Sequence, residues 1–314
     1  PYKVSFQKII DAKEVFPLRT AAIGIGSNSL RMLLAEIQNG ELHRLKRYRE
    51  GMRTFAALDE NGNIIPSMIC QACEKVGQFV SEARSAGAET VHIFATSAIR
   101  DAKNQAEFLE KLEQAVQLPV EVCPGELEAR LSYIGATGKE PSGLIDIGGG
   151  STEIAIGKGM NVREAVSLQL GAVRLFRCLT ISDEATAEKA LEEAKKIIRP
   201  VTARFQAQEK LQWVGVGGTF TLAAALAQQI PWNEKEKIHQ YRLAQEKVRA
   251  ILTFLAPMTV EERLALPSMQ PNRADIAAHG MAILLACMEE LDIGVITVSE
   301  YGNLEGYLKV KYLN

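Results

Sequence analysis

The chain has 314 residues, of which 47% are apolar and 24% charged, a composition typical of a globular protein large enough for two domains. Its formal net charge of −2 excludes the global basic field that binds nucleic acid, so an anion site must be a local patch. The sequence shows no secretory signal and no apolar run of about 20 residues, so we expect a cytoplasmic protein without a membrane partner.

The first half of the chain predicts a three-stranded meander that continues into helices and a further strand. Residues 20–50 alternate apolar and polar positions around an Asn-Gly pair at 39–40, which is a strong signal for a hairpin turn. Apolar residues at helical spacing predict a helix over 66–86. The stretch 91–100 predicts a strand that runs into a loop, and Asn104 is placed to cap the next helix.

The same order of elements restarts in the second half. Residues 143–171 again predict strand, turn, strand, turn and strand. A long helix with a kink at Pro200 follows, and a buried strand then ends in a glycine turn at 217–218. After further helices, the last strand is expected over 294–299. This repetition indicates an internal duplication, with the boundary between the halves near 123–130.

Two turns, one in each half, share a sequence frame. IGIGSNS at 23–29 and IDIGGGS at 145–151 both read apolar, any residue, apolar, Gly, two small residues and Ser. Such turns place several N–H groups on one concave surface, which binds phosphate oxygens. Facing each other across a cleft, the two loops would hold one elongated anion; the alternative is a pair of plain hairpin turns. The candidate phosphate ligands are Ser27, Asn28, Ser29, Gly148, Gly149, Gly150 and Ser151.

Carboxylates flank the second of these turns. Asp146 stands before it and Glu153 after it, which is unfavourable beside phosphate unless a cation lies between them. We therefore expect Mg²⁺, which takes carboxylate and phosphate oxygens together; for Glu153 the alternative is a surface strand residue. A third turn, made of Gly217, Gly218 and Thr219, offers a helix N-terminus to another phosphate or a nucleotide, or is a tight turn and nothing more.

Eight motifs follow one another along the chain: GSNSLR (26–31), ATSAIRDAKN (95–104), GELEARLSYIGA (125–136), DIGGGSTE (146–153), SLQLGAVRL (167–175), VGVGGT (214–219), NRADIAAHG (272–280) and SEYGNLEG (299–306). In this order they resemble the exopolyphosphatase / guanosine pentaphosphate phosphatase family, which belongs to the superfamily of actin, heat-shock chaperone ATPases and sugar kinases. The resemblance implies an α/β fold of two ribonuclease-H-like domains, each with a mixed five-stranded sheet flanked by helices, and an active site in the cleft between them. We place the domains at 1–125, with 300–314 as an optional addition, and at 126–299.

The resemblance also implies an activity. Family members hydrolyse the terminal phosphoanhydride of inorganic polyphosphate, or the 5′ γ-phosphate of guanosine pentaphosphate, with Mg²⁺. It points to Glu128 as the general base, since this residue directly precedes the AR of the family's EEAR motif. A carboxylate can accept the proton of an attacking water. Glu126, two residues earlier, is the alternative candidate for this role. Guanidinium groups pair with phosphate oxygens, although a structural ion pair is the alternative for each arginine in the motifs. The candidates are Arg31, Arg100, Arg174 and Arg273.

The sequence departs from the family pattern at three positions. Gly24 stands where the first loop of the family has Asp, Leu127 replaces a carboxylate of EEAR, and Leu304 replaces the arginine of LREG. Loss of a metal-binding carboxylate predicts weaker metal binding and slower turnover. The leading expectation is a Mg²⁺-dependent phosphohydrolase of reduced activity that binds polyphosphate or guanosine penta- or tetraphosphate. One alternative is a sensor that binds the same ligands with little or no catalysis. A second is a kinase, which the matched phosphatase motifs disfavour. A homodimer is possible as the oligomeric state.

Overall fold

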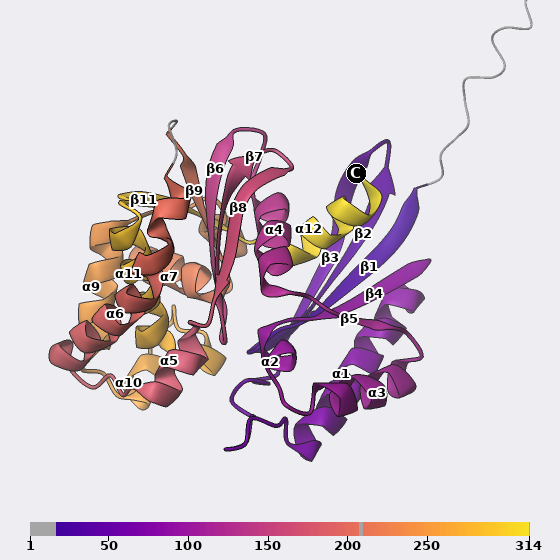
Figure 1. Cartoon of the computed structure of the whole chain (residues 1–314), viewed down its shortest axis with the longest axis horizontal. Coiled ribbons are helices and arrows are strands. Elements are labelled where there is room, and N and C mark those ends of the chain that lie inside the picture. Colours follow the sequence, from indigo (N-terminus) through magenta and orange to yellow (C-terminus); the bar gives the residue numbers. More distant parts are fainter. Residues whose placement is uncertain (1–16, 207–209, 314) are drawn as a thin grey trace, which may run out of the picture.

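The computed structural model describes residues 17–206 and 210–313. Two mixed β-sheets lie side by side, each with helices on its faces, and a pair of helices lies between them (Figure 1). We call residues 17–122 the first lobe and residues 141–299 the second lobe. None of the helices in the described ranges is long and apolar enough to cross a membrane.

The first lobe has a five-stranded sheet of order β3-β2-β1-β4-β5. Strand β1 pairs antiparallel with β2 and parallel with β4, and β4 pairs parallel with β5. Asn39 and Gly40 both have positive φ (54° and 74°), so the predicted hairpin turn is confirmed. The elements are β1 (Leu18–Ile25), β2 (Ser29–Gln38), β3 (Glu41–Gly51), α1 (Pro66–Ser85), β4 (Thr90–Ala95), α2 (Ser97–Arg100), α3 (Gln105–Val116) and β5 (Val120–Val122).

The second lobe repeats this topology and so confirms the duplication. Its sheet has the order β10-β11-β9-β6-β7-β8, in which β6, β7, β8, β9 and β11 correspond to β1 to β5 with the same directions of pairing. The prediction of five strands is wrong for this sheet, because the three-residue strand β10 adds to its edge beside β11. The elements are β6 (Pro141–Ile147), β7 (Thr152–Lys158), β8 (Asn161–Leu168), α5 (Ala172–Cys178), α6 (Glu184–Ile198), the 3₁₀ helix η2 (Arg199–Phe205), β9 (Gln212–Val216), α7 (Gly218–Gln228), α8 (Lys235–Ile238), β10 (Arg242–Ala244), α9 (Gln245–Leu255), α10 (Val260–Leu264), the 3₁₀ helix η3 (Pro271–Arg273), α11 (Ala277–Glu290) and β11 (Val295–Ser299).

Helices α4 (Gly125–Ala136) and α12 (Asn303–Tyr312) fill the space between the sheets (Figure 1). Leu304 and Leu308 of α12 pack on the first sheet, and Ala129 and Tyr133 of α4 pack on the second. The two helices cross at backbone contact, because a Cβ at Gly306 would collide with the carbonyl of Leu131. The helix pair therefore sets the spacing between the inner faces of the two sheets.

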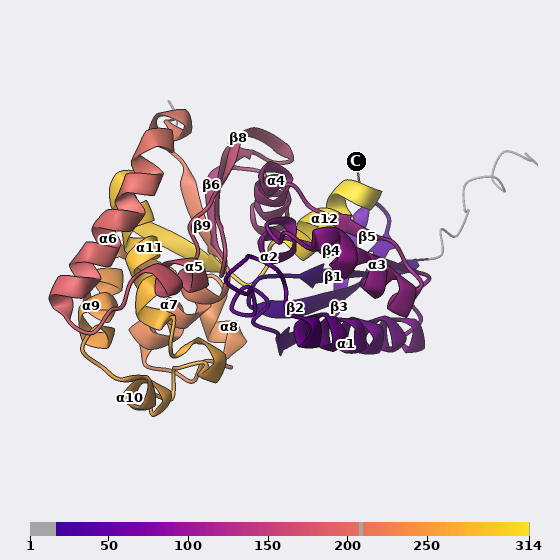
Figure 2. The same ribbon diagram turned by 60° about the horizontal axis from the view of Figure 1, so that its bottom comes forward.

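Alternation along the strands divides each sheet into an inner and an outer face. Ile23 and Ile25 of β1 pack outward with residues of α1 and α3, whereas Ala22 packs inward with residues of α12. Figure 2 shows α1 and α12 on opposite sides of this sheet. In the second sheet Ile145 of β6 packs outward among the helices around α11, and Leu144 packs inward against α4. Even-numbered positions of β6 consequently point to the space between the lobes, and Asp146 is one of them.

Two local predictions change in the structure. Asn104 stands at the N-terminus of α3, but its side chain does not cap the helix; it accepts from the Ile64 N–H at 2.8 Å and donates to the Ile64 carbonyl at 3.0 Å. The predicted kink at Pro200 is instead the end of α6, which continues as the 3₁₀ helix η2, since proline lacks the N–H that an α-helix requires.

Candidate active site

The two glycine-rich turns form equivalent loops at the inner ends of the two hairpins. In the first loop (residues 26–29) the Gly26 N–H donates to the Ser29 carbonyl at 3.0 Å, and in the second loop (residues 148–151) the Gly148 N–H donates to the Ser151 carbonyl at 2.9 Å. The same turn is therefore built twice, as the shared sequence frame predicts.

The two loops lie tip to tip. A Cβ built on Gly149 would stand 3.1 Å from the Cβ of Ser27, and one on Gly150 would stand 2.5 Å from the Oγ of Ser97. Ser27 and Ser97 are themselves hydrogen-bonded across the first lobe, with 2.7 Å between their Oγ atoms. Glycine is required in the second loop because it allows this approach. The loops face each other as predicted, but at contact distance rather than across a cleft.

Buried polar atoms without a partner occur in and beside the first loop. Both amide atoms of Asn28, the Nε of Arg31 and the Nη2 of Arg100 are buried and form no hydrogen bond within the described ranges. Leaving such atoms unpaired costs free energy, and native proteins pair nearly all of them with protein, water or ligand. These atoms therefore favour a polar ligand beside the first loop.

Three carboxylates are buried between the second sheet and α4. Glu128, Asp146 and Glu153 are only 6%, 7% and 2% exposed. Burial raises the pKa of all three, and repulsion from Glu128 and Asp146 helps to hold the pKa of Glu153 well above its usual value. Without a bound cation the folded protein therefore disfavours the ionised form of these three carboxyl groups.

Each carboxylate of the strand pair is held by a serine. Asp146 and Glu153 stand directly opposite each other on β6 and β7. The Ser132 hydroxyl of α4 donates to Oδ2 of Asp146 at 2.7 Å, and the Ser167 hydroxyl of β8 donates to Oε1 of Glu153 at 2.7 Å. The sequence analysis missed both serines, although Ser132 lies one helical turn after Glu128 and must share its face.

The two rival glutamates of α4 have different surroundings. Oε2 of Glu128 accepts from Nη1 of Arg100 at 2.9 Å, and the same nitrogen donates to the Cys123 carbonyl at 2.9 Å. The side chain of Glu126 is 62% exposed and pairs with Arg130. Glu128 therefore lies with the buried carboxylates and Glu126 does not, while Arg100 is committed to Glu128 and keeps one nitrogen for another ligand.

Arg31, Arg49 and Arg273 form a second cluster of like charges. Arg31 and Arg49 stand opposite each other on β2 and β3. Arg49 is exposed to solvent, yet surrounding protein and, next, repulsion from Arg31 lower its pKa to about 10. Burial, followed by repulsion from Arg49 and Arg31, lowers the pKa of Arg273 well below its usual value. An anion bound among the three side chains would relieve this repulsion.

Arg49 is a site residue that the sequence analysis missed. The predicted turn at 39–40 would pair Arg31 with Tyr48, and a register shift between Leu34 and Ala35 brings Arg49 opposite Arg31 instead, so the sequence pattern gave no signal for this pair. Arg273 in turn covers the third turn: a Cβ at Gly218 would collide with its guanidinium group. Thr219, a predicted phosphate ligand, is buried against α11, where a Cβ at Gly280 would stand 2.8 Å from its Oγ1.

Arg174 connects the lobes in this structure. Its Nε donates to the Gly150 carbonyl of the second loop at 2.7 Å, and its Nη2 donates to Asp101 of the first lobe at 2.6 Å. A second ion pair has its arginine on the first lobe and its carboxylate on the second: Arg53 pairs with Asp275, which lies beside η3. We call these two ion pairs the interlobe clasp. The sequence analysis offered a structural ion pair as the alternative to phosphate binding by each motif arginine, and for Arg174 the structure shows such an ion pair.

Gly24 and Leu304, two of the departures from the family pattern, face each other. A Cβ built on Gly24 would stand 3.2 Å from Cδ2 of Leu304 and 3.4 Å from Cζ of Phe94. The space where a family carboxylate would begin is therefore lined by apolar atoms, and the two departures form one apolar contact.

The described residues contain no group of three or more His, Cys, Asp or Glu side chains close enough to hold a metal ion by themselves. Mg²⁺, however, commonly binds through one or two carboxylates and completes its shell with water and substrate phosphate. Asp146 and Glu153, opposite each other and short of positive charge, fit such a site.

Comparison with known proteins extends the likeness over both lobes. Residues 33–314 match the Ppx/GppA phosphatase family. The chain is 32% identical over 312 residues to Exopolyphosphatase 2 of Mycobacterium tuberculosis, covering 92% of this chain and 97% of that protein.

Solved structures show the same arrangement. The Aquifex aeolicus PPX-GPPA enzyme superposes with a TM-score of 0.80 at 29% identity, covering 94% of this chain and 99% of that one. An exopolyphosphatase from Cytophaga hutchinsonii gives a TM-score of 0.84 at 25% identity, covering 94% and 97%. These likenesses confirm the predicted fold class, two ribonuclease-H-like domains of the actin-like superfold, with the sixth strand of the second sheet as the difference.

Proposed function

The chain belongs to the Ppx/GppA phosphatase family, and from this premise we propose that it hydrolyses the terminal phosphoanhydride of inorganic polyphosphate with Glu128 as general base. The observation that carries the proposal is the contact between the two loops, from which the helix that begins at Ser97 leads to Arg100 and its bond to the buried Glu128. Burial raises the pKa of Glu128. A carboxylate with a raised pKa can accept the proton of an attacking water near neutral pH.

The roles of the other residues follow from the needs of phosphoryl transfer, which depends on positioning and neutralisation of charge. The N–H groups of the two loops would hold the terminal phosphates. Arg100 fixes Glu128 through one nitrogen and offers its unpaired Nη2 to the charge that develops on the phosphate. Asp146 and Glu153 would hold Mg²⁺, which when bound neutralises phosphate charge and polarises the phosphorus–oxygen bonds.

The arginine cluster supports a long inorganic chain as the substrate. Arg31, Arg49 and Arg273 extend the positive surface beyond the loops, and polyphosphate offers one anionic group after another to such a surface. Arg273 also occupies the space over Gly218, where the sequence left room for a nucleotide. Hydrolysis of guanosine pentaphosphate, a homodimer and a cytoplasmic location stay predictions.

The sensor remains the second candidate because Gly24 and Leu304 remove polar groups beside the site. The test is release of orthophosphate from long polyphosphate, tripolyphosphate and guanosine pentaphosphate, each with Mg²⁺ and with a chelator. We expect Mg²⁺-dependent release, fastest from long polyphosphate. Tight binding of polyphosphate without release in Mg²⁺ would favour the sensor, and release only from guanosine pentaphosphate would overturn the assigned substrate.

A further inference from the structure

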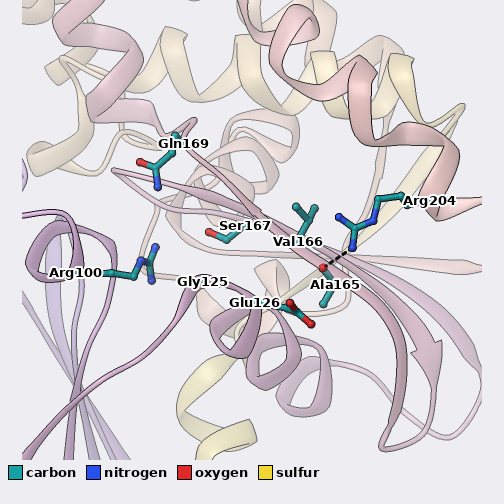
Figure 3. Close-up of a pocket in the computed structure, with 8 residues that line it drawn as sticks. All are labelled: Arg100, Gly125, Glu126, Ala165, Val166, Ser167, Gln169 and Arg204. Carbon is teal, nitrogen blue, oxygen red and sulfur yellow. Dashed lines mark hydrogen bonds between the residues drawn. The ribbon is translucent and has the colours of Figure 1, made fainter.

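A cavity of about 320 Å³ opens beside the buried carboxylates, between the start of α4, strand β8 and η2 (Figure 3). Most of its wall belongs to the second lobe, and Arg100 reaches it from the first lobe. The lining residues are Arg100, Gly125, Glu126, Ala165, Val166, Ser167, Gln169 and Arg204.

A single layer of side chains separates this cavity from the catalytic carboxylates. Arg100 lines the cavity and donates to Glu128 at 2.9 Å, and Ser167 lines the cavity and donates to Glu153 at 2.7 Å. A Cβ at Gly125 would stand 2.6 Å from the Cβ of Ser167 and 3.6 Å from the unpaired Nη2 of Arg100. Small motions of Arg100 and Ser167 would therefore connect the two spaces.

Hydrogen-bond donors dominate the cavity wall. Arg100, Gln169 and Arg204 carry N–H donors on this wall (Figure 3), whereas the single hydroxyl hydrogen of Ser167 is already donated to Glu153. Arg204 is held in place by Glu164 on the surface at 3.0 Å. The carboxylate on the wall, that of Glu126, is already paired with Arg130. A small, highly charged oxyanion fits this set of donors better than an apolar or cationic ligand does.

The geometry of the proposed reaction creates a need for such a site. Hydrolysis at the terminal anhydride produces orthophosphate at the inner end of the chain, next to Glu128. The shortened polyphosphate still occupies the loops and the arginine cluster, so it blocks the way by which it entered. We propose, on the basis of the proposed function, that the cavity binds inorganic phosphate and is the route by which this product leaves.

The direct test is calorimetric titration of inorganic phosphate into the full chain. In Glu128→Gln protein saturated with long polyphosphate, phosphate should still bind, because the cavity is separate from the substrate cleft. Adding Arg204→Gln should weaken this binding about tenfold, the loss expected for one charge-assisted hydrogen bond. Arg163→Gln is the matched control, because it removes the same charge from β8 outside the cavity and should leave phosphate affinity unchanged.

Displacement of phosphate by polyphosphate, or equal affinity in Arg204→Gln, would overturn the exit site. Failure of the exit site is distinguishable from failure of the proposed function. Persistent hydrolysis in Glu128→Gln would refute the assigned base. The cavity could then still be tested without polyphosphate, by comparing the phosphate affinity of Arg204→Gln with that of Arg163→Gln, each made in the otherwise unaltered chain. In product-inhibition kinetics, phosphate should be non-competitive with polyphosphate; purely competitive inhibition would also contradict the exit site.

Discussion

Arg174 of the second lobe donates to Asp101 of the first lobe across a 2.6 Å ion pair, while its Nε holds the Gly150 carbonyl of the second loop. One side chain thus couples the position of a phosphate-binding loop to the contact between the lobes. Arg53 and Asp275 make the reciprocal connection. Because both pairs join opposite lobes, the clasp favours the closed arrangement in which the two loops touch.

Breaking the clasp should weaken substrate binding. In Asp101→Asn the ion pair with Arg174 is lost although the shape of the side chain is kept. We expect the affinity for polyphosphate to fall by about 1 kcal/mol, or roughly fivefold, and the radius of gyration in X-ray scattering to increase. Glu107→Gln is the control, because it breaks an exposed ion pair with Lys111 away from the lobe contact. Unchanged affinity and unchanged scattering in Asp101→Asn would refute the clasp.

Gly24→Asp should not restore activity by itself, contrary to what the family pattern alone suggests. The new carboxylate would begin 3.2 Å from Leu304 and 3.4 Å from Phe94, and an unpaired charge among apolar atoms costs about 3 kcal/mol. We expect a lower free energy of unfolding and no gain in turnover. Adding Leu304→Arg should recover much of the loss, since the two charges could pair. A double-mutant cycle measures this coupling; higher turnover in Gly24→Asp alone would show that the apolar contact does not govern the site.

Ser132→Ala should shift the pH dependence of hydrolysis. The hydrogen bond from Ser132 favours the ionised form of Asp146 and lowers its pKa against the effect of burial. Without it the pKa of Asp146 rises, so the acid limb of the pH–rate profile should move to higher pH and Mg²⁺ should bind more weakly. Ser142→Ala, which removes the hydroxyl of another buried serine, one that donates to the Glu140 carbonyl, should leave the profile in place. If the acid limb of the pH–rate profile shifted equally in both variants, the effect would not come from the bond between Ser132 and Asp146.

Glu153→Gln should stabilise the Mg²⁺-free protein. The pKa of Glu153 is well above its ordinary value of 4.5 in the folded state, so the folded protein holds this proton more tightly than the unfolded chain. The stability of the unaltered protein therefore falls as pH rises above the unfolded pKa towards the folded one. Thermal unfolding should show a gain for Glu153→Gln that is small at about pH 5 and larger at about pH 8. A gain independent of pH would contradict the raised pKa of Glu153.

Local sequence signals predicted the elements that depend on neighbouring residues. The Asn39-Gly40 turn, helix α1 and the two loops all follow from short patterns, and the repeated frame also predicted that the loops would face each other. Asp146 and Glu153 were found because they flank a loop in the chain, not because the sequence shows that they pair across β6 and β7.

Features that depend on the meeting of distant segments were not predictable in this way. Arg49 was not among the candidates from the sequence, because its pairing with Arg31 and its approach to Arg273 exist only in the folded lobes. Arg174 was expected to bind phosphate, but Asp101 lies 73 residues away in the sequence. The facing of Gly24 and Leu304 likewise appears only once α12 packs on the first sheet.

The most direct test of the account measures polyphosphate binding and the first turnover in the same sample of Glu128→Gln. We predict affinity within about threefold of the unaltered protein, and orthophosphate release slower by about 100-fold or more, the usual contribution of a general base. The exposed neighbour variant Glu126→Gln should release phosphate at the normal rate. Normal release from Glu128→Gln, or loss of release only in Glu126→Gln, would contradict the assignment of Glu128 as the residue that activates water.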